Sequence, residues 1–202
     1  KILSHGILGP SNPTLTNITI SNNRAYSKGG GIYLQSVYYN TILTNLTIIG
    51  NEADLGGGIH LDRSDPIITN VNIKENLALK GGGIYLDESE PTTFNMSINN
   101  NTAVTGGGIY IIESDTELYN LIIYRNHSDG WNLGNGGGGI YLDNSTTLKL
   151  INTTISENTA NYDGNAILYD ENYSQNLTSL TIYNSIIWNN EYSQIASISG
   201  HW

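Results

Sequence analysis

The sequence predicts an all-β protein that folds as a parallel β-helix, right-handed, with about seven coils and three short strands per coil. Two repeated phrases carry this prediction. A hexapeptide of the form GGGIYL, with one degenerate copy GNAILY, recurs at 29–34, 56–61, 81–86, 106–111, 137–142 and 164–169. A second phrase, Asn-x-x-Ile-x-x-Asn-x-Ala, is locked to the first and recurs at 16–25, 44–53, 69–78, 94–103, 119–128, 151–160 and 183–192. A repeat at this spacing indicates a solenoid, in which each unit stacks on the next.

Each unit reads as short strands joined by turns. Its runs of Ile, Leu, Thr and Tyr alternate in polarity and are separated by Gly, Asn, Ser and Pro, which is typical of strand and turn. No window of ten or more residues has helical spacing. A propeller blade needs about 40 to 45 residues, more than one unit supplies. Equivalent strands of successive units are therefore expected to pair in parallel, about 4.8 Å apart.

Near the start of the chain, residues 5–13 form a degenerate copy of the half of the repeat that contains the hexapeptide. The two repeated phrases then follow in alternation. Three columns of aliphatic side chains are expected to point inward, because β-branched residues suit a narrow pleated core. The Asn phrase contributes Ile20, Ile48, Ile73, Ile98, Ile123, Ile155 and Ile187. The hexapeptide contributes Ile32, Ile59, Ile84, Ile109, Ile140 and Ile167, and also Leu34, Leu61, Leu86, Ile111 and Leu142.

Two columns of Asn flank each Ile of the Asn phrase. The first is Asn17, Asn45, Asn70, Asn95, Asn120, Asn152 and Asn184. The second is Asn23, Asn51, Asn76, Asn101, Asn126, Asn158 and Asn190. Asn at a fixed place in every coil predicts amide ladders, in which each side chain bonds to those above and below. The glycines are expected to form the turn, and no Gly-Lys-Ser/Thr follows them to suggest phosphate binding.

Composition limits the function classes. The 202 residues form a single expected domain, 1–202, with formal net charge −10 and a sequence pI near 4.6. The eight Lys and Arg residues do not cluster, so nucleic acid is not an expected partner. No apolar run approaches the length of a membrane span, and there is no Cys. Neither end shows an amphipathic cap, so we expect a segment of a longer rod or a unit that stacks end to end.

An aromatic column suggests a ligand. Alternation along the hexapeptide places Tyr33, His60, Tyr85, Tyr110 and Tyr141 on the opposite side from the inward Ile column. We therefore expect an exposed row of rings, and with Trp131 from an insertion these residues form the predicted glycan-binding set, because aromatic rings stack on sugar faces. The alternative interpretation is that the Tyr ladder only stiffens the sheet.

An acidic column suggests a cation. Asp62, Asp87, Asp143 and Asp170 share one column, and Asp65, Glu90 and Asp115 share another. Stacked carboxylates repel one another unless a cation or hydrogen bonds compensate. Calcium is the one candidate ion, at Asp62, Asp65, Asp87 and Glu90, because it binds several hard oxygens. The alternative is turn capping along a solvated ridge, in which Arg63 pairs with Glu88 across one coil; no other cofactor is expected.

Two insertions interrupt the repeat, at 127–135 and 170–176, and irregular loops often carry function. Six residues in and between these insertions could frame a shallow site: Trp131, His127, Asp129, Tyr162, Asp163 and Tyr173. Sequons also occur throughout. Those at Asn17, Asn45, Asn95 and Asn152 belong to the first ladder and are expected to be inaccessible. Those at Asn126, Asn144, Asn172 and Asn176 are candidate glycosylation sites.

The paired phrases resemble the right-handed parallel β-helix repeats of the pectin-lyase-like superfamily. Within it they are most similar to the repeats of polymorphic outer-membrane and adhesin-like surface proteins. The segment NSIIWNN at 184–190, followed by Gln194-Ile195, also resembles the last coils of large secreted bacterial proteins. The resemblance implies a right-handed fold and a secreted or cell-surface location. It also implies that polysaccharide lyases and hydrolases are relatives, which use carboxylates with a basic residue or with a His.

These observations predict a non-catalytic extracellular β-solenoid that serves as a structural stalk, an adhesin or a filament-forming segment. Polysaccharide or a cell-surface glycan, bound along the Tyr and Asp columns, is the expected partner, together with end-to-end self-association. The alternative is a polysaccharide lyase or glycoside hydrolase, for which Arg63 beside Asp62, Asp87 and Glu88 is the main support. No adjacent Asp-Asp pair of the hydrolase pattern occurs.

Overall fold

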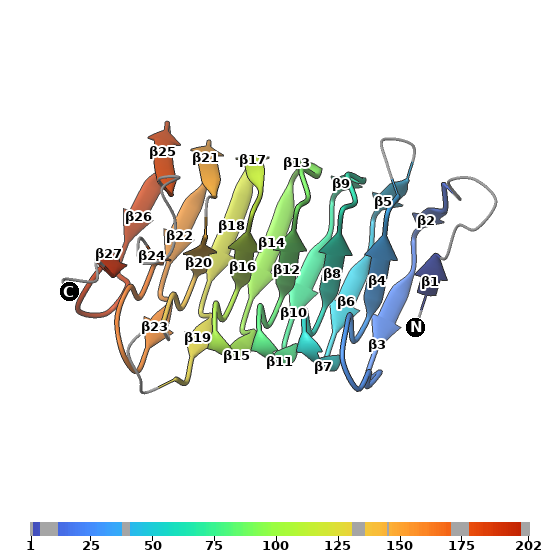
Figure 1. Ribbon diagram of the computed structural model, residues 1–202, viewed down its shortest axis with the longest axis horizontal. Helices are drawn as coiled ribbons and strands as arrows, with labels where there is room; N and C mark the ends of the chain where they lie inside the picture. Colours follow the sequence, from blue (N-terminus) through green and yellow to red (C-terminus); the bar gives the residue numbers. More distant parts are fainter. Residues whose placement is uncertain are drawn as a thin grey trace.

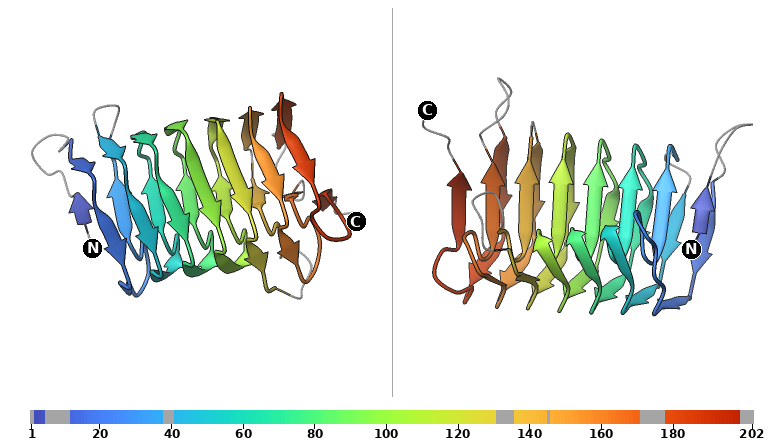
Figure 2. Two further views of the ribbon diagram at one scale, coloured as in Figure 1. Left: turned by 180° about the vertical axis from the view of Figure 1, so that it is seen from behind. Right: turned by 60° about the horizontal axis from the view of Figure 1, so that its bottom comes forward.

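The computed structural model describes residues 2–4, 12–37, 41–130, 136–144, 146–170 and 178–198. These residues wind into a parallel β-helix whose coils follow one another along the rod from the N-terminus to the C-terminus (Figure 1). The views in Figure 2 show that equivalent strands of successive coils lie side by side along the whole length. The rod has about six turns, so the predicted count of about seven is roughly right.

The described strands form five sheets that run along the rod, and every pairing in them is parallel. Sheet 1 consists of β1 (Ile2–Ser4), β4 (Ile32–Gln35), β8 (Ile59–Asp62), β12 (Ile84–Asp87), β16 (Ile109–Ile112), β20 (Ile140–Asp143), β24 (Ile167–Asp170) and β27 (Ile195–Ile198). Sheet 2 consists of β3 (Thr19–Ser21), β6 (Thr47–Ile49), β10 (Asn72–Lys74), β14 (Met96–Asn99), β18 (Leu121–Tyr124), β22 (Thr154–Ser156) and β26 (Ile186–Trp188).

The other three sheets are smaller. Sheet 3 consists of β7 (Glu52–Leu55), β11 (Leu77–Lys80), β15 (Thr102–Thr105), β19 (His127–Ser128) and β23 (Thr159–Ala160). Sheet 4 consists of β2 (Thr14–Thr16), β5 (Ile42–Thr44), β9 (Ile67–Thr69) and β13 (Thr92–Phe94). Sheet 5 consists of β17 (Asp115–Tyr119), β21 (Thr147–Ile151) and β25 (Ser179–Tyr183).

A typical coil contains four short strands, one more than predicted. The coil made by β9, β10, β11 and β12 visits sheets 4, 2, 3 and 1 in that order. The extra break lies at Asn70, whose φ of 56° turns the chain between β9 and β10. The sequence TNVNIK reads as one alternating strand. Asn adopts this left-handed conformation more readily than most residues, so the first Asn of each phrase bends the strand instead of continuing it.

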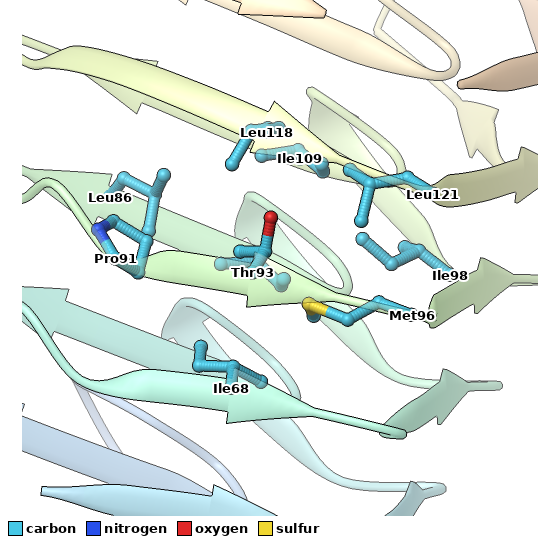
Figure 3. A pocket seen from close by; sticks show the side chains of 10 residues that line it. Ile68, Leu86, Pro91, Thr93, Met96, Ile98, Ile109, Leu118 and Leu121 are labelled. Carbon is cyan, nitrogen blue, oxygen red and sulfur yellow. The ribbon is translucent and has the colours of Figure 1, made fainter. Parts of the chain in front are cut away.

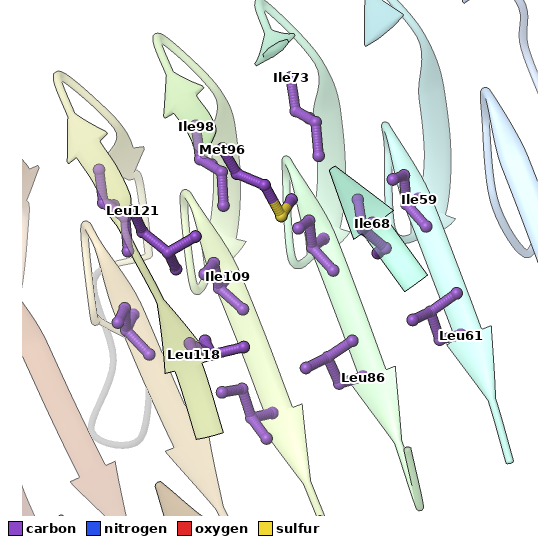
Figure 4. Packing of buried hydrophobic residues seen from close by; sticks show 14 of the residues in the cluster. Ile59, Leu61, Ile68, Ile73, Leu86, Met96, Ile98, Ile109, Leu118 and Leu121 are labelled. Atoms are coloured by element: carbon purple, nitrogen blue, oxygen red, sulfur yellow. The ribbon is translucent and has the colours of Figure 1, made fainter. Parts of the chain in front are cut away.

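The predicted interior columns are confirmed by strand register. Ile48, Ile73 and Ile98 align across β6, β10 and β14, and all three are fully buried. Figure 4 shows side chains from several strands meeting in the interior, including Ile59 and Leu86. Burying each such side chain contributes roughly 1.5–3 kcal/mol, so the stacked columns are the main source of stability.

One small gap remains in this interior, beside Met96 and Thr93 (Figure 3). Its volume is about 10 Å³ and its lining is apolar, which is about the size of one water molecule and too small for a ligand. The gap arises because Thr93 replaces the Ile68 of the preceding coil. The Thr93 hydroxyl accepts a hydrogen bond from the Tyr119 amide at 3.0 Å, so its polar group is satisfied.

The second Asn column forms a buried ladder, as predicted. The Oδ1 of Asn101 accepts hydrogen bonds from the backbone amide and the Nδ2 of Asn76, at 3.0 and 2.9 Å. Its own Nδ2 donates to Ile73 O and to Asn126 Oδ1, each at 3.0 Å. Because Asn76, Asn101 and Asn126 are at most 1% exposed, each amide satisfies its neighbours and keeps the turn free of unpaired polar groups.

Candidate functional site

The aromatic column lies in sheet 1, where the hexapeptide repeat places it, but the prediction that it is exposed is wrong. Tyr33, His60, Tyr85, Tyr110 and Tyr141 are all buried, and none is more than 7% exposed. Between His60 and Tyr141 the ring centroids are 4.8 to 5.0 Å apart and the rings are nearly parallel. Each of these ring faces is therefore covered by another ring and is not available to a sugar.

The cover over this column comes from the ends of the sheet 3 strands. Lys28, Leu55 and Lys80 are in register immediately before the glycines. The Lys80 ammonium lies 4.8 Å from the centroid of the Tyr110 ring and donates to its hydroxyl at 3.0 Å, while Leu55 packs against the rings. Gly56, with φ of 64°, makes the tight turn; a Cβ there would lie 2.9 Å from that of His60. The sharp turn folds the neighbouring strand over the rings, which alternation alone does not predict.

The acidic column is tied to the aromatic one by hydrogen bonds between successive coils. The hydroxyl of Tyr33 donates to Asp62 at 3.0 Å, and that of Tyr141 donates to Asp170 at 3.2 Å. Tyr110 makes the same type of bond with Asp143. The carboxylates therefore act as acceptors for the buried tyrosines, and burial raises the pKa of Tyr110. Three of the four aspartates of the column, Asp62, Asp143 and Asp170, are thus bonded to a tyrosine. Burial, together with repulsion from Asp62, raises the pKa of the fourth, Asp87.

Asp62 accepts hydrogen bonds from four side chains. It accepts from Lys28 Nζ and Arg63 Nε at 3.0 Å each, from Gln35 Nε2 at 3.1 Å, and from Tyr33. Burial would raise the pKa of Asp62, but the hydrogen bonds from Lys28, Arg63 and Tyr33 lower it to about 2. The predicted pairing of Arg63 with Glu88 is replaced by this contact with the adjacent Asp62.

The calcium site predicted at Asp62, Asp65, Asp87 and Glu90 is not formed. Within the described ranges, no three His, Cys, Asp or Glu side chains are grouped to hold a metal ion. Asp62 is occupied by its four donors, and Asp65 Oδ1 accepts from the Glu90 amide at 2.7 Å. The turn uses the carboxylates as hydrogen-bond acceptors, which is the capping alternative.

A second aromatic row, which the sequence analysis missed, lies on the outside of sheets 4 and 5. Phe94 on β13 is 41% exposed, and its ring centroid lies 6.1 Å from that of the half-buried Tyr119 on β17, at an interplanar angle of 24°. Beside them Glu117 accepts from the Tyr119 hydroxyl and pairs with Lys149 Nζ at 2.6 Å. A shallow groove of about 430 Å³ adjoins this row, lined by Glu90, Pro91, Thr92, Asp115, Glu117 and Tyr119.

A signal for this row was present in the sequence. The residue before the first Asn of each Asn phrase reads Thr16, Thr44, Thr69, Phe94, Tyr119, Ile151 and Tyr183. These residues align between paired strands, as Thr69 does with Phe94 and Ile151 does with Tyr183. Because the chain bends at the following Asn, this position points outward at the end of its strand.

A family model described as a right-handed β-helix region matches residues 3–128, more than half of the chain. The chain belongs to the right-handed β-helix family. This match confirms the predicted handedness and is consistent with the resemblance to the pectin-lyase-like superfamily. No curated protein and no solved structure matches the chain. The described part of this β-helix has no helix of sufficient length and apolar character to cross a membrane.

The accessibility of the sequons in this β-helix differs from the prediction. Asn126 belongs to the buried ladder and is 0% exposed, so its Nδ2 is inaccessible and that prediction is wrong. Asn144 is half-buried. Asn172 and Asn176 lie outside the described residues, as does Trp131. The first ladder is instead exposed at Asn17, Asn45, Asn95 and Asn152, because these residues turn outward at a positive φ.

The insertions of the β-helix are only partly described. His127 lies in β19, where its Nδ1 is 2.8 Å from the Thr159 hydroxyl of the next coil. Asp129 is exposed, Tyr162 is 44% exposed, and Asp163 is half-buried. Residues 131–135 and 171–177, with Trp131 and Tyr173, lie outside the described residues. His127 is therefore a strand residue that joins two coils.

His60 is the irregular member of the β-helix's aromatic column, and we expect it to make stability depend on pH. It is 0% exposed, and neither ring nitrogen has a hydrogen-bond partner among the described residues. Burial, assisted by the charge of Lys28 and opposed by Asp62, lowers the pKa of His60 to about 4. The unfolded chain takes up this proton near pH 6.5, so stability falls as the pH drops below that value.

Replacement His60→Tyr should remove this dependence. Between pH 7 and pH 5, His60 alone should cost the native protein about 2 kcal/mol, whereas Tyr remains neutral in both states. A tyrosine would also place a hydroxyl near Asp87, as Tyr33 does for Asp62. Urea denaturation at both pH values measures the difference between the two proteins. Equal pH slopes for wild type and variant would contradict the assignment to His60.

Proposed function

We propose that this β-helix is a non-catalytic rod of a secreted or cell-surface protein, where it serves as a structural stalk or adhesin segment. The observation that supports it most is the use of the acidic column. Asp62 is bonded by four donors, and Asp143 and Asp170 accept from tyrosines of the preceding coils. Carboxylates that hold adjacent coils together stiffen the rod and are not free to transfer protons to a substrate.

The rod character is also supported by how adjacent coils are joined. Backbone ladders, the buried Asn ladder and the Tyr–Asp bonds all connect one coil to the next. A stack of such nearest-neighbour contacts gives an elongated body that presents many outward side chains. That shape suits a spacer which holds a binding surface away from a cell.

End-to-end association belongs to the same proposal. In the first and last described coils, Leu15, Ile20, Ile182 and Ile187 are only partly buried, although they continue the interior columns. A second copy stacked end to end would complete their burial. Sedimentation of the purified chain over a concentration range would measure self-association, and a constant monomer would remove the filament-forming alternative.

The rival function is a polysaccharide lyase or glycoside hydrolase. Its candidate base is Arg63, which lies on the turn beside Asp62, Asp87 and Glu88. The hydrogen bond and charge of Asp62 raise the pKa of Arg63, which opposes loss of the proton that a base must lose. The geometry therefore gives less support to this alternative than to the stalk.

Viscosity measurements distinguish the two functions. The chain would be incubated with acidic and neutral polysaccharides, with calcium and with a chelator. We expect no change in viscosity on any polymer. A calcium-dependent fall that disappears in Arg63→Ala would establish cleavage and overturn the stalk proposal, and a fall that survives Arg63→Ala would overturn it through other residues.

A further inference from the structure

The exposed Asn ladder forms a series of bends along the outside of the rod, and four of its members begin an Asn-x-Ser/Thr sequon. These are Asn17, Asn45, Asn95 and Asn152. All four are exposed, and each has a φ between 52° and 56° that turns the chain into the following strand of sheet 2. They therefore combine the motif of an N-glycan acceptor with the surface position that the modification needs.

The sequon at Asn95 opens onto a shallow groove on the outside of sheet 2. Asn95 and Ser97 both line this groove, whose volume is about 380 Å³, together with Asn72 of the preceding coil and Ile122 of the following one. Met96, between the two sequon residues, is buried. The amide and the hydroxyl of the sequon thus face the same hollow, so a sugar can lie over the strand without displacing the backbone.

The bond that holds Asn95 in its ladder survives modification. Its Nδ2 carries two hydrogens and donates one of them to Asn70 Oδ1 at 3.2 Å. Transfer from a lipid-linked oligosaccharyl diphosphate forms a bond between Nδ2 and the anomeric carbon and breaks the bond from that carbon to the diphosphate oxygen. One amide proton passes to a base of the transferring enzyme. One N–H therefore remains for Asn70.

The buried ladder cannot accept the same change. Both hydrogens of Asn126 Nδ2 are in use, to Ile98 O at 2.9 Å and to Asn158 Oδ1 at 3.0 Å, and Asn126 is 0% exposed. A sugar on this nitrogen would break one of these bonds inside the rod, which destabilises the native state. Because Asn126 also begins a sequon, the two ladders predict opposite outcomes for the same motif.

Asn152 is the second acceptor. It is exposed, and its side-chain amide has no hydrogen-bond partner in the part of the chain that the structure describes. Thr153 is buried, whereas the half-buried Thr154 aligns with Ile122 and Ile186, which are 51% and 62% exposed. Thr154 therefore points outward from β22, on the side from which an enzyme would reach the Asn152 amide.

The spacing of the sequons determines how many glycans fit. Successive coils are about 4.8 Å apart, which is less than the width of a substituted pyranose ring. Asn95 and Asn152 are separated by the coil of Asn120, which begins no sequon, so their glycans would be about 10 Å apart. Asn17 and Asn45 lie in adjacent coils and are bonded to each other at 3.0 Å, so one glycan would obstruct the other.

We propose that Asn95 and Asn152 are modification sites that carry N-linked glycans, transferred from a lipid-linked oligosaccharide. This inference rests on the proposed secreted or cell-surface location and adds a covalent modification to the stalk. Asn17 and Asn45 form a third site that holds one glycan at a time. Glycans are bulky and solubilising, so on the exposed ladder they keep another rod from packing against this edge while the bonds between coils stay intact.

The test is to secrete the full chain from a eukaryotic host and to map its glycans by mass spectrometry. Peptide N-glycosidase in heavy-oxygen water converts each modified Asn to a labelled Asp, which fragment spectra locate. We expect glycans at Asn95 and Asn152 on most of the secreted molecules and none at Asn126. Ser97→Ala should remove the glycan at Asn95 alone, and Thr154→Val should remove the glycan at Asn152 alone.

Ser97→Thr and Thr154→Ser are the matched controls, because each keeps the hydroxyl group of its sequon. Both should be glycosylated as wild type is, and circular dichroism should show all four variants folded. The proposal is overturned if Asn95 or Asn152 stays unmodified, or if Asn126 is modified as fully as they are. Either result with unchanged polymer viscosity leaves the stalk function standing, whereas polymer cleavage removes the stalk function whatever the glycan result.

Discussion

Replacement of Asn101 by Ala should cost about 3–5 kcal/mol of stability. The change removes four hydrogen bonds at once, two accepted by Oδ1 from Asn76 and two donated by Nδ2 to Ile73 and Asn126. Asn101 is 0% exposed, so water cannot replace the lost partners. Each buried polar group left without a partner costs about 1–3 kcal/mol. Urea denaturation followed by circular dichroism would measure the loss.

The matched control is Asn70→Gly in the exposed ladder. Asn70 has a φ of 56° and makes side-chain bonds of 3.2 Å to Asn45 and Asn95. Glycine keeps this conformation, and water can replace the exposed bonds, so we expect a loss below about 1 kcal/mol. Equal losses of stability in the two variants would mean that burial does not determine how much a ladder Asn contributes to the free energy of unfolding.

Gly82→Ala should destabilise the rod by about 3 kcal/mol or more through steric conflict. A Cβ at this position would lie 2.5 Å from Gly107 O and 2.5 Å from Thr102 O, both backbone atoms of the next coil. Backbone atoms cannot rotate away, so successive coils would have to separate and weaken the bond from the Gly82 amide to Gly106 O. Overpacking commonly costs about 1–3 kcal/mol and more where the structure cannot relax.

Thermal denaturation would measure this loss, and hydrogen exchange would show where it arises. Exchange should rise first in β12 and β16, the strands that follow the two glycine turns. Gly50→Ala is the control, because its new Cβ would meet only the Asn22 side chain, at 2.7 Å. Its φ of 65° adds a strain of about 1–2 kcal/mol. If Gly50→Ala proved the more damaging change, contact between coils would not be the reason for the glycine repeat.

Several features of the fold follow directly from the repeat. Ile73 and Leu86 occupy the predicted interior columns, and Asn101 the predicted buried ladder. Such predictions succeed because equivalent residues of a solenoid contact one another, so the spacing of the phrases defines the register. The same two phrases were also enough to predict membership of the right-handed β-helix family.

The candidate site was harder to predict from the sequence than the fold was. Tyr85 and Tyr110 alternate with the buried Ile column as predicted, yet they are also buried. The reason is that the glycine turn folds residues of sheet 3 over this column, as Lys80 lies over the Tyr110 ring. Phe94, by contrast, is 41% exposed. It stands before the bend at Asn95, which alternation of polar and apolar residues does not reveal.

The repeated phrases were enough to predict the solenoid, its parallel strand pairing, the interior aliphatic columns and the two Asn columns, because these depend only on which residues recur at one spacing. Which outward columns meet solvent could be seen only in the folded protein. That depends on the angles at which the chain turns at Gly56 and Asn70 and on which strand then covers which side chain. Turn angles arise from backbone conformation and inter-coil contact together, so they are read from the folded coil and not from the repeat.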